Sequence, residues 1–129
     1  MNGSALLDTN LVIAHLRSDA ALTQRLRHAS PIHVPWIVLG ELYFGAHKSN
    51  AAAKILHQVQ RFMSGTIVLY PDDRTTEEYG EIKAVLARAG TPIPDNDIWI
   101  AAAARRFQLP LATRDQHFGL VKGLSLLAW

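Results

Sequence analysis

The sequence predicts a single α/β domain with a mainly parallel central sheet of about five strands, flanked by helices on both faces. Short apolar runs near residues 5, 32, 67, 110 and 125 alternate with longer segments of helical periodicity. Strands separated by helices pair in parallel, and a parallel sheet is normally covered on both sides. The length of 129 residues suits one such domain over residues 1–129, without repeats or linkers.

Composition and charge limit the classes of protein to consider. A hydrophobic content of 49% with 19% charged residues is typical of a globular protein and argues against disorder. No apolar run approaches the roughly 20 residues of a membrane span, and the absence of cysteine is compatible with the cytosol. We therefore expect a cytoplasmic protein that does not enter a membrane. Five of the 11 acids lie between Asp72 and Glu81, which leaves much of the remaining surface basic and suited to a polyanionic partner.

In the first half of the chain, the apolar run at residues 5–7 predicts a buried first strand, and residues 32–35 predict the second. Proline limits the second strand at both ends because it cannot donate a backbone hydrogen bond to a sheet. The other segments have apolar residues at helical spacing. The predicted helices cover Leu11–Leu16, Leu22–Leu26, Trp36–His47 and Asn50–Phe62.

In the second half, Thr66–Tyr70 reads as a buried strand closed by Pro71, and a helix then opens on acidic residues. Thr75 and Glu78 have the spacing of a capping box at its start. The next helix is expected to begin with Asp95 as its N-terminal cap and to reach Phe107. Its four alanines, residues 101–104, allow close packing against the sheet. Strands at residues 109–113 and 124–127 complete the domain.

Two acids directly follow predicted strands. Asp8 comes straight after Leu7, and Asp115 follows the strand that ends at Thr113. The carboxyl ends of strands are where α/β sheets present ligands and catalytic groups. Each acid also has an ordinary structural interpretation, because Asp8 suits a helix cap and Asp115 suits a turn.

Two further acids lie on apolar helical faces. Glu41 has Val38 and Phe44 one turn away, so a carboxylate there must be paired, protonated or metal-bound. Asp97 lies in the first turn of its helix, with the alanine-rich face on its side. The structural alternatives are an acid that reaches water for Glu41 and a carboxylate that complements the helix dipole for Asp97.

Together, the four acids predict a cation site. If the strands before Asp8 and Asp115 are neighbours in the sheet, all four carboxylates share one edge of it. Clustered carboxylates repel one another and need compensating positive charge, yet no Lys or Arg shares an apolar face with them. We therefore expect a hard divalent cation, Mg²⁺ or Mn²⁺, which takes oxygen ligands and keeps several waters.

The segments that carry these acids resemble the PIN-domain ribonucleases, and among them the VapC-type toxins of prokaryotic toxin–antitoxin pairs. The resemblance rests on residues 6–10, the segment around Glu41, residues 95–102 and residues 112–118, and it covers the whole chain. It implies a PIN-like fold and a Mg²⁺- or Mn²⁺-dependent endoribonuclease that is inhibited by a cognate antitoxin and is usually dimeric. The residues that match the family's metal-binding acids are Asp8, Glu41, Asp97 and Asp115, and those that match supporting positions are Thr9, Asn10 and Thr113.

One residue departs from the family pattern. Many members carry a further acid just before the aromatic residue that corresponds to Phe118, and here that residue is His117. A second metal is therefore expected to be weakly held, or absent until the phosphate oxygens of the substrate complete its ligands. The histidines share no helical face at ligand spacing, so a zinc site is not expected.

The expected reaction is hydrolysis of RNA by a metal-activated water. Asp8, Asp97 and Asp115 would bind the metal directly or through water, and Glu41 would orient the attacking water. In-line attack by water leaves a 5′-phosphate and a 3′-hydroxyl. Four cations are expected to flank the acids and to hold RNA phosphates, with solvated surface charge as the alternative interpretation. They are Arg105, Arg106, Arg114 and Lys122.

Two other classes of protein share part of this pattern. Haloacid-dehalogenase-like phosphatases also use an Asp after the first strand, but they need a second Asp where this chain has Asn10. A receiver-like regulatory module would hold a switch metal without catalysis. It would need a phospho-acceptor Asp after the third strand, for which Asp72 is the candidate, and a Lys after the last strand, where no Lys follows Leu124.

Overall fold

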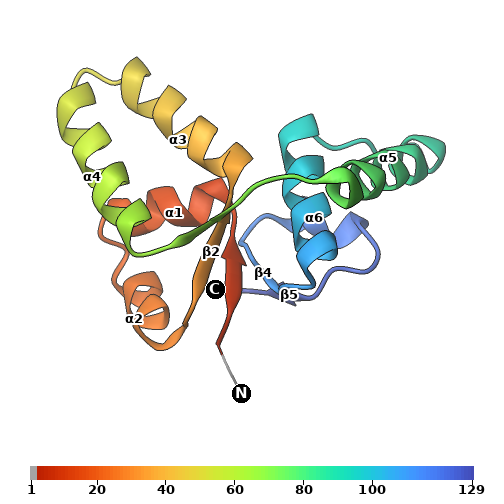
Figure 1. The fold of residues 1–129 in the computed structure, drawn as a ribbon, viewed down its shortest axis with the longest axis horizontal. Helices are drawn as coiled ribbons and strands as arrows, with labels where there is room; N and C mark the ends of the chain where they lie inside the picture. Colours follow the sequence, from red (N-terminus) through yellow and green to blue (C-terminus); the bar gives the residue numbers. More distant parts are fainter. Residues whose placement is uncertain (1–2) are drawn as a thin grey trace.

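In the computed structural model, which describes residues 3–129, a five-stranded sheet carries helices on both faces (Figure 1). Every strand pair is parallel, and the order across the sheet is β3–β2–β1–β4–β5. The strands are β1 (Ala5–Leu7), β2 (Ile32–Pro35), β3 (Ile67–Leu69), β4 (Leu111–Ala112) and β5 (Leu126–Leu127). This confirms the predicted fold class. The strands that precede Asp8 and Asp115, β1 and β4, are neighbours, which is what a shared edge for the four acids requires.

The helices divide into two groups (Figure 1). The connections from β1 to β2 and from β2 to β3 run in one direction across the sheet, and the connection from β3 to β4 runs back. Since such crossovers are right-handed, the two directions place helices on opposite faces. The first group is α1 (Thr9–Leu16), α2 (Ala20–His28), α3 (Trp36–Lys48) and α4 (Ala52–Ser64). The second is α5 (Asp73–Arg88) and α6 (Asp95–Phe107), followed by the short 3₁₀ helix η1 (Gln116–Leu120).

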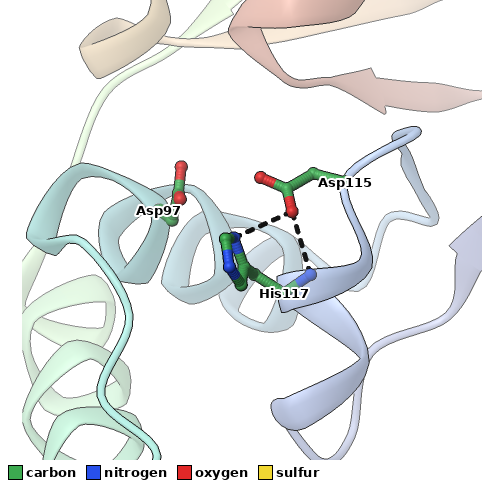
Figure 2. A group of neighbouring side chains, drawn as sticks. All are labelled: Asp97, Asp115 and His117. Carbon is green, nitrogen blue, oxygen red and sulfur yellow. Dashed lines mark hydrogen bonds and ion pairs between the residues drawn. The ribbon is translucent and has the colours of Figure 1, made fainter.

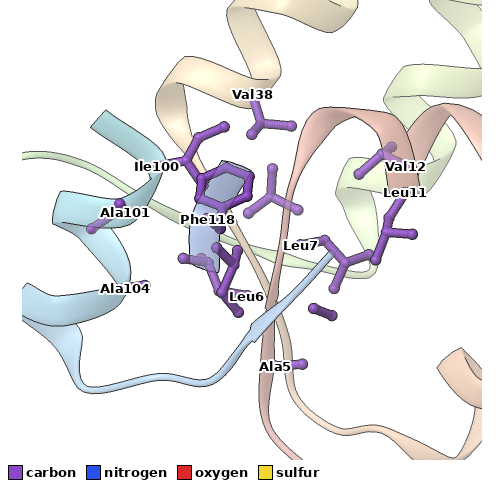
Figure 3. Packing of buried hydrophobic residues seen from close by; sticks show 14 of the residues in the cluster. Ala5, Leu6, Leu7, Leu11, Val12, Val38, Ile100, Ala101, Ala104 and Phe118 are labelled. Atoms are coloured by element: carbon purple, nitrogen blue, oxygen red, sulfur yellow. The ribbon is translucent and has the colours of Figure 1, made fainter. Parts of the chain in front are cut away.

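The core surrounds β1, the central strand. All three of its residues are fully buried, and they belong to one apolar cluster with Ile100 of α6 and Phe118 of η1 (Figure 3). Ala101–Ala104 are buried in the same cluster, as the alanine run predicted. Full burial of a leucine or phenylalanine side chain contributes about 1.5–3 kcal/mol, so this cluster holds α6 and η1 against the strand that leads into Asp8.

The third strand differs from its prediction. Thr66–Tyr70 was expected to be a buried strand, but Ile67 is 47% exposed and Tyr70 is 65% exposed. The reason is the position of β3 at the edge of the sheet, where only β2 pairs with it. An apolar run does not distinguish an edge strand from a central one.

Two predicted caps are also wrong. The capping box of α5 joins Asp72 and Thr75, not Thr75 and Glu78: the Asp72 carboxylate accepts from the Thr75 N–H at 3.0 Å, and the Thr75 hydroxyl accepts from the Asp72 N–H at 3.1 Å. At α6 the cap position is occupied by Pro94, and Asp95 is the first helical residue. Among residues 3–129, none of the helices has the length and apolar character needed to cross a bilayer.

Candidate metal centre

The four predicted acids meet at the carboxyl ends of β1 and β4. These two strands flank the point where the direction of the connections reverses, which is where open α/β sheets bind ligands. Asp8 directly follows β1, and Asp115 is the cap residue of η1 just beyond β4. The first turn of α6 contributes Asp97, and α3 contributes Glu41.

Asp8 is the most deeply buried acid of the group, with 3% of its surface exposed. Its Oδ1 accepts from the backbone N–H of Leu11 at 2.9 Å, and its Oδ2 accepts from the hydroxyl of Thr113. Burial raises the pKa of Asp8, and repulsion from Asp115 and Glu41 adds to this, while the two hydrogen bonds oppose it. Asp8 therefore caps α1 and belongs to the acidic cluster at the same time.

Thr113 connects the two strand ends. Its hydroxyl donates to Asp8 and accepts from the backbone N–H of Asp115 at 2.9 Å. Thr113 is 6% exposed, and its hydrogen bond to Asp8 is buried, while the one from Asp115 is partly buried. Thr113 thereby holds Asp8 and the segment of Asp115 in one fixed arrangement.

A second threonine positions Glu41. The hydroxyl of Thr9 lies 2.5 Å from Oε1 of Glu41, and it joins the start of α1 to the middle of α3. Glu41 also lines a groove between α1, α3 and α4, together with Ile13 and Arg17. In contrast, the neighbouring Asn10 is exposed and, within residues 3–129, makes no hydrogen bond to any of the four acids.

The third part of the site is a group of two acids and a histidine (Figure 2). Ligand-type atoms of Asp97, Asp115 and His117 all lie within 4.8 Å of one another. Oδ1 of Asp115 is 2.9 Å from both Nδ1 and the backbone N–H of His117. The pKa of Asp97 is raised to about 6, first by burial and then by the carboxylates of Asp115, Glu41 and Asp8, while His117 opposes the shift. This mutual repulsion shows that the four carboxylates share one electrostatic environment.

In the sequence, His117 stands out as a departure from the family pattern and as the histidine next to Asp115. Ligand spacing on an α-helix does not apply to this pair, because Asp115 and His117 are two residues apart on a turn that enters a 3₁₀ helix. The sequence feature that indicates His117 as part of the site is this spacing of two residues from an acid at the end of a strand.

Three of the four predicted RNA-binding cations lie away from the acids, which corrects the predicted position. Arg105 binds Glu78 and Glu81 at 2.7 Å each, and Arg106 binds Asp72 with 2.6 Å between its Nη2 and Oδ2. Both arginines are in the last turn of α6, about 12 Å along the helix from Asp97.

The other two predicted cations have different surroundings. Lys122 lies near the same remote end of α6, since its carbonyl accepts from Arg105. Arg114 precedes Asp115 directly, but its guanidinium group donates to Asp19 at 2.9 Å and to the carbonyl of Trp129 at 2.6 Å. The arginine therefore links α2 to the end of the chain.

The charges around the four acids determine whether they fit a divalent cation. Within residues 3–129, no Lys or Arg forms an ion pair with Asp8, Glu41, Asp97 or Asp115. Among the described residues, hydrogen-bond donors oppose this negative charge, and His117 does so at Asp97. An oxygen-rich set with uncompensated charge is what hard divalent cations bind in proteins, so the residues present fit such an ion.

The fold and this edge define an α/β protein with a cluster of acids that fits a divalent cation. The model of the PIN domain matches residues 5–124, and the chain belongs to the PIN-domain family.

Comparison with individual proteins agrees with this assignment. Ribonuclease VapC2 of Haemophilus influenzae is 34% identical to this chain and the tRNA(fMet)-specific endonuclease VapC of Salmonella typhimurium is 32% identical, with 96% of each chain covered. The DNA-bound VapBC structure from Salmonella typhimurium superposes with a TM-score of 0.92 at 32% identity over 98% of each chain. VapBC-5 from Mycobacterium tuberculosis, of the VapBC family of toxin–antitoxin systems, gives a TM-score of 0.76 at 27% identity, covering 97% of this chain and 96% of that one.

The two alternative classes are not supported. Receiver domains have the strand order 2-1-3-4-5, whereas this sheet has the order 3-2-1-4-5. The candidate phospho-acceptor Asp72 caps α5 and pairs with Arg106. Against the phosphatase, the position that would need a second Asp holds Asn10, and the whole domain matches the PIN family instead.

Proposed function

We propose that this chain is an endoribonuclease that requires a divalent cation, Mg²⁺ or Mn²⁺, and acts as the toxin of a toxin–antitoxin pair. The observation that carries the proposal is the meeting of four carboxylates without a paired Lys or Arg, at the ligand-binding edge of a PIN-domain sheet. The names of the full-length relatives, which are ribonucleases and an endonuclease acting on tRNA, support RNA as the substrate.

Asp8, Asp97 and Asp115 are the residues that would hold the cation, directly or through water. When bound, a divalent cation lowers the pKa of water and polarises a phosphate. Glu41 has the position to orient the attacking water and to accept its proton. Attack by water in line with the scissile bond then gives a 5′-phosphate and a 3′-hydroxyl.

The supporting side chains act by limiting motion. Thr113 holds Asp8 from one side while the Leu11 N–H holds it from the other, so neither carboxylate oxygen rotates freely. Thr9 does the same for Glu41. Since an error of about 1 Å in the position of a catalytic group reduces the rate about 100-fold, both threonines are positioning residues in this proposal.

The proposal includes two protein partners. VapBC-5 is described as a member of a toxin–antitoxin family, which supports a cognate antitoxin for this chain. The resemblance to VapC-type toxins supports a homodimer and a cytoplasmic location, where the RNA substrate is found.

The test is cleavage of single-stranded RNA and of tRNA by the purified chain. We expect cleavage with Mg²⁺ or Mn²⁺, none in EDTA, and 5′-phosphate ends on the products. Asp8→Asn should lose at least 100-fold in kcat while its circular dichroism spectrum stays that of the wild type. Asp73→Asn is the matched control, because Asp73 is an exposed acid in the first turn of α5, and it should cut at the wild-type rate. Full activity in Asp8→Asn would refute the assignment.

A further inference from the structure

We propose that His117 is itself a ligand of the cation, and that this nitrogen shifts the preference of the site from Mg²⁺ towards Mn²⁺. The inference rests on the proposed function in that the acidic edge must bind a cation. It adds a residue and a metal selectivity that the four acids alone do not provide.

The spacing of the three side chains is the first argument. In an octahedral site with bonds of about 2.1 Å, adjacent ligand atoms lie about 3.0 Å apart and opposite ones about 4.2 Å apart. Nδ1 of His117 lies 2.9 Å from Oδ1 of Asp115, which is the adjacent spacing. With Asp97 included, the ligand-type atoms stay within 4.8 Å, slightly beyond the opposite spacing. A small closure of these side chains would therefore bring all three onto one ion.

The second argument is that the backbone already fixes the start of the histidine side chain. The N–H of His117 donates to Oδ1 of Asp115 at 2.9 Å, which is the cap interaction of η1. The next residue, Phe118, is 1% exposed and anchors η1 in the core. His117 thus begins from a rigid position, while its side chain is 61% exposed on the open side of the site, where an ion and water can reach it.

The third argument is charge. Within residues 3–129, no Lys or Arg forms an ion pair with Asp97 or Asp115. A divalent cation held by these two carboxylates and His117 would supply the positive charge that the pair of acids lacks.

The chemistry of nitrogen then determines the selectivity. Carboxylate, carbonyl and water oxygens suit both Mg²⁺ and Mn²⁺, but Mn²⁺ is the first member of the Irving–Williams series of transition metals and accepts an imidazole nitrogen more readily than Mg²⁺ does. A histidine therefore adds more to the binding of Mn²⁺ than to that of Mg²⁺. An aspartate at residue 117 would instead add a hard oxygen and a further negative charge, which favours Mg²⁺.

The experiment measures metal binding directly, without RNA and without turnover. Calorimetric titration of Mn²⁺ and Mg²⁺ is performed on the wild type, His117→Gln and His117→Asp, with His57→Gln as control because His57 is an exposed histidine on α4. Pulsed electron paramagnetic resonance of bound Mn²⁺ reports coupling to nitrogen. Circular dichroism confirms that each variant is folded, and glutamine at residue 117 keeps the backbone cap.

We expect nitrogen coupling in the wild type and in His57→Gln, and its loss in His117→Gln. His117→Gln should weaken Mn²⁺ binding by about tenfold or more and change Mg²⁺ binding much less, whereas His117→Asp should reverse the preference. Mn²⁺ binding without nitrogen coupling, and unchanged in His117→Gln, would overturn this inference while the proposed function stands. If neither ion binds the wild type, the proposed function fails as well.

Discussion

The hydroxyl of Thr113 donates a hydrogen bond to Oδ2 of Asp8 and so joins two residues that are 105 positions apart in the chain. The same oxygen accepts from the backbone N–H of Asp115. One small side chain thus positions the acids that follow the neighbouring strands β1 and β4. Its donation to Asp8 also opposes the effect of burial, which raises the pKa of this carboxyl.

Replacement of Thr113 by valine should destabilise the protein and slow catalysis. Valine keeps the shape but removes the donor to Asp8 and the acceptor for Asp115. A hydrogen bond to a charged group contributes about 1.5–3 kcal/mol, so the free energy of unfolding should fall by about 2 kcal/mol in urea titrations at pH 7.5. RNA cleavage should fall at least tenfold. Thr113→Ser, which keeps the hydroxyl, should stay near the wild type. Equal stability of the valine variant and the wild type would show that the bridge contributes nothing.

Asp97 should make stability depend on pH. Its pKa is about 6 in the folded chain and near 3.8 when unfolded. Between these values the folded state binds more protons than the unfolded state, so stability falls as pH rises from about 4 to 6. Asp97→Asn should therefore be more stable than the wild type at pH 7.5, by about 1–2 kcal/mol after allowance for solvent screening. The gain should vanish below pH 4. Urea titrations in EDTA across this pH range measure the free energy of unfolding of the wild type and of Asp97→Asn. A gain in stability that is independent of pH would contradict the electrostatic explanation.

A divalent cation should reverse this effect. Mn²⁺ or Mg²⁺ neutralises the repulsion around Asp97, so either ion should raise the thermal midpoint of the wild type by several degrees at pH 7.5 and by little at pH 4.5. Asp97→Asn should gain less from the ion at either pH. If added metal does not change the thermal midpoint of the wild type, this would argue against a cation at this edge.

Thr9 should affect the chemical step more than the binding of metal. Thr9→Val removes the hydroxyl that lies 2.5 Å from Oε1 of Glu41, so Glu41 loses its fixed orientation. We expect kcat for RNA cleavage to fall about tenfold while the Kd for Mn²⁺ changes less than about twofold, because Asp8, Asp97 and Asp115 remain in place. Thr9→Ser serves as control. A large loss of metal affinity in Thr9→Val would instead make Glu41 a principal ligand.

Arg105 and Arg106 should matter for stability and not for RNA. Their guanidinium groups bind Glu78, Glu81 and Asp72, and so join α6 to α5. Arg105→Met and Arg106→Met should lower the thermal midpoint but leave the KM for RNA within about twofold of the wild type. The comparison should be made at low salt, where phosphate contacts are strongest. A clear rise in KM, with the fold intact, would show that these arginines contribute to RNA binding.

The placement of the four acids could be predicted because it depends on local patterns. An apolar run that ends in an acid placed Asp8 and Asp115 at strand ends, and helical periodicity placed Glu41 and Asp97 on inward faces. Two of the features that were predicted wrongly depend on long-range arrangement. Whether the strand at Ile67 lies at an edge follows from the order of the whole sheet. The partners of Arg105 are acids 24 and 27 residues away on another helix, and no local pattern reports them.

The order of the strands has a consequence for synthesis on the ribosome. The central strand β1 is made first, but its neighbour β4 is made about a hundred residues later, and only then can Thr113 reach Asp8. A growing chain that has reached Gly90 possesses two of the four acids and one open edge beside β1. The edge that carries the four acids is therefore completed only when nearly all of the protein has been translated, and an incomplete chain cannot assemble it.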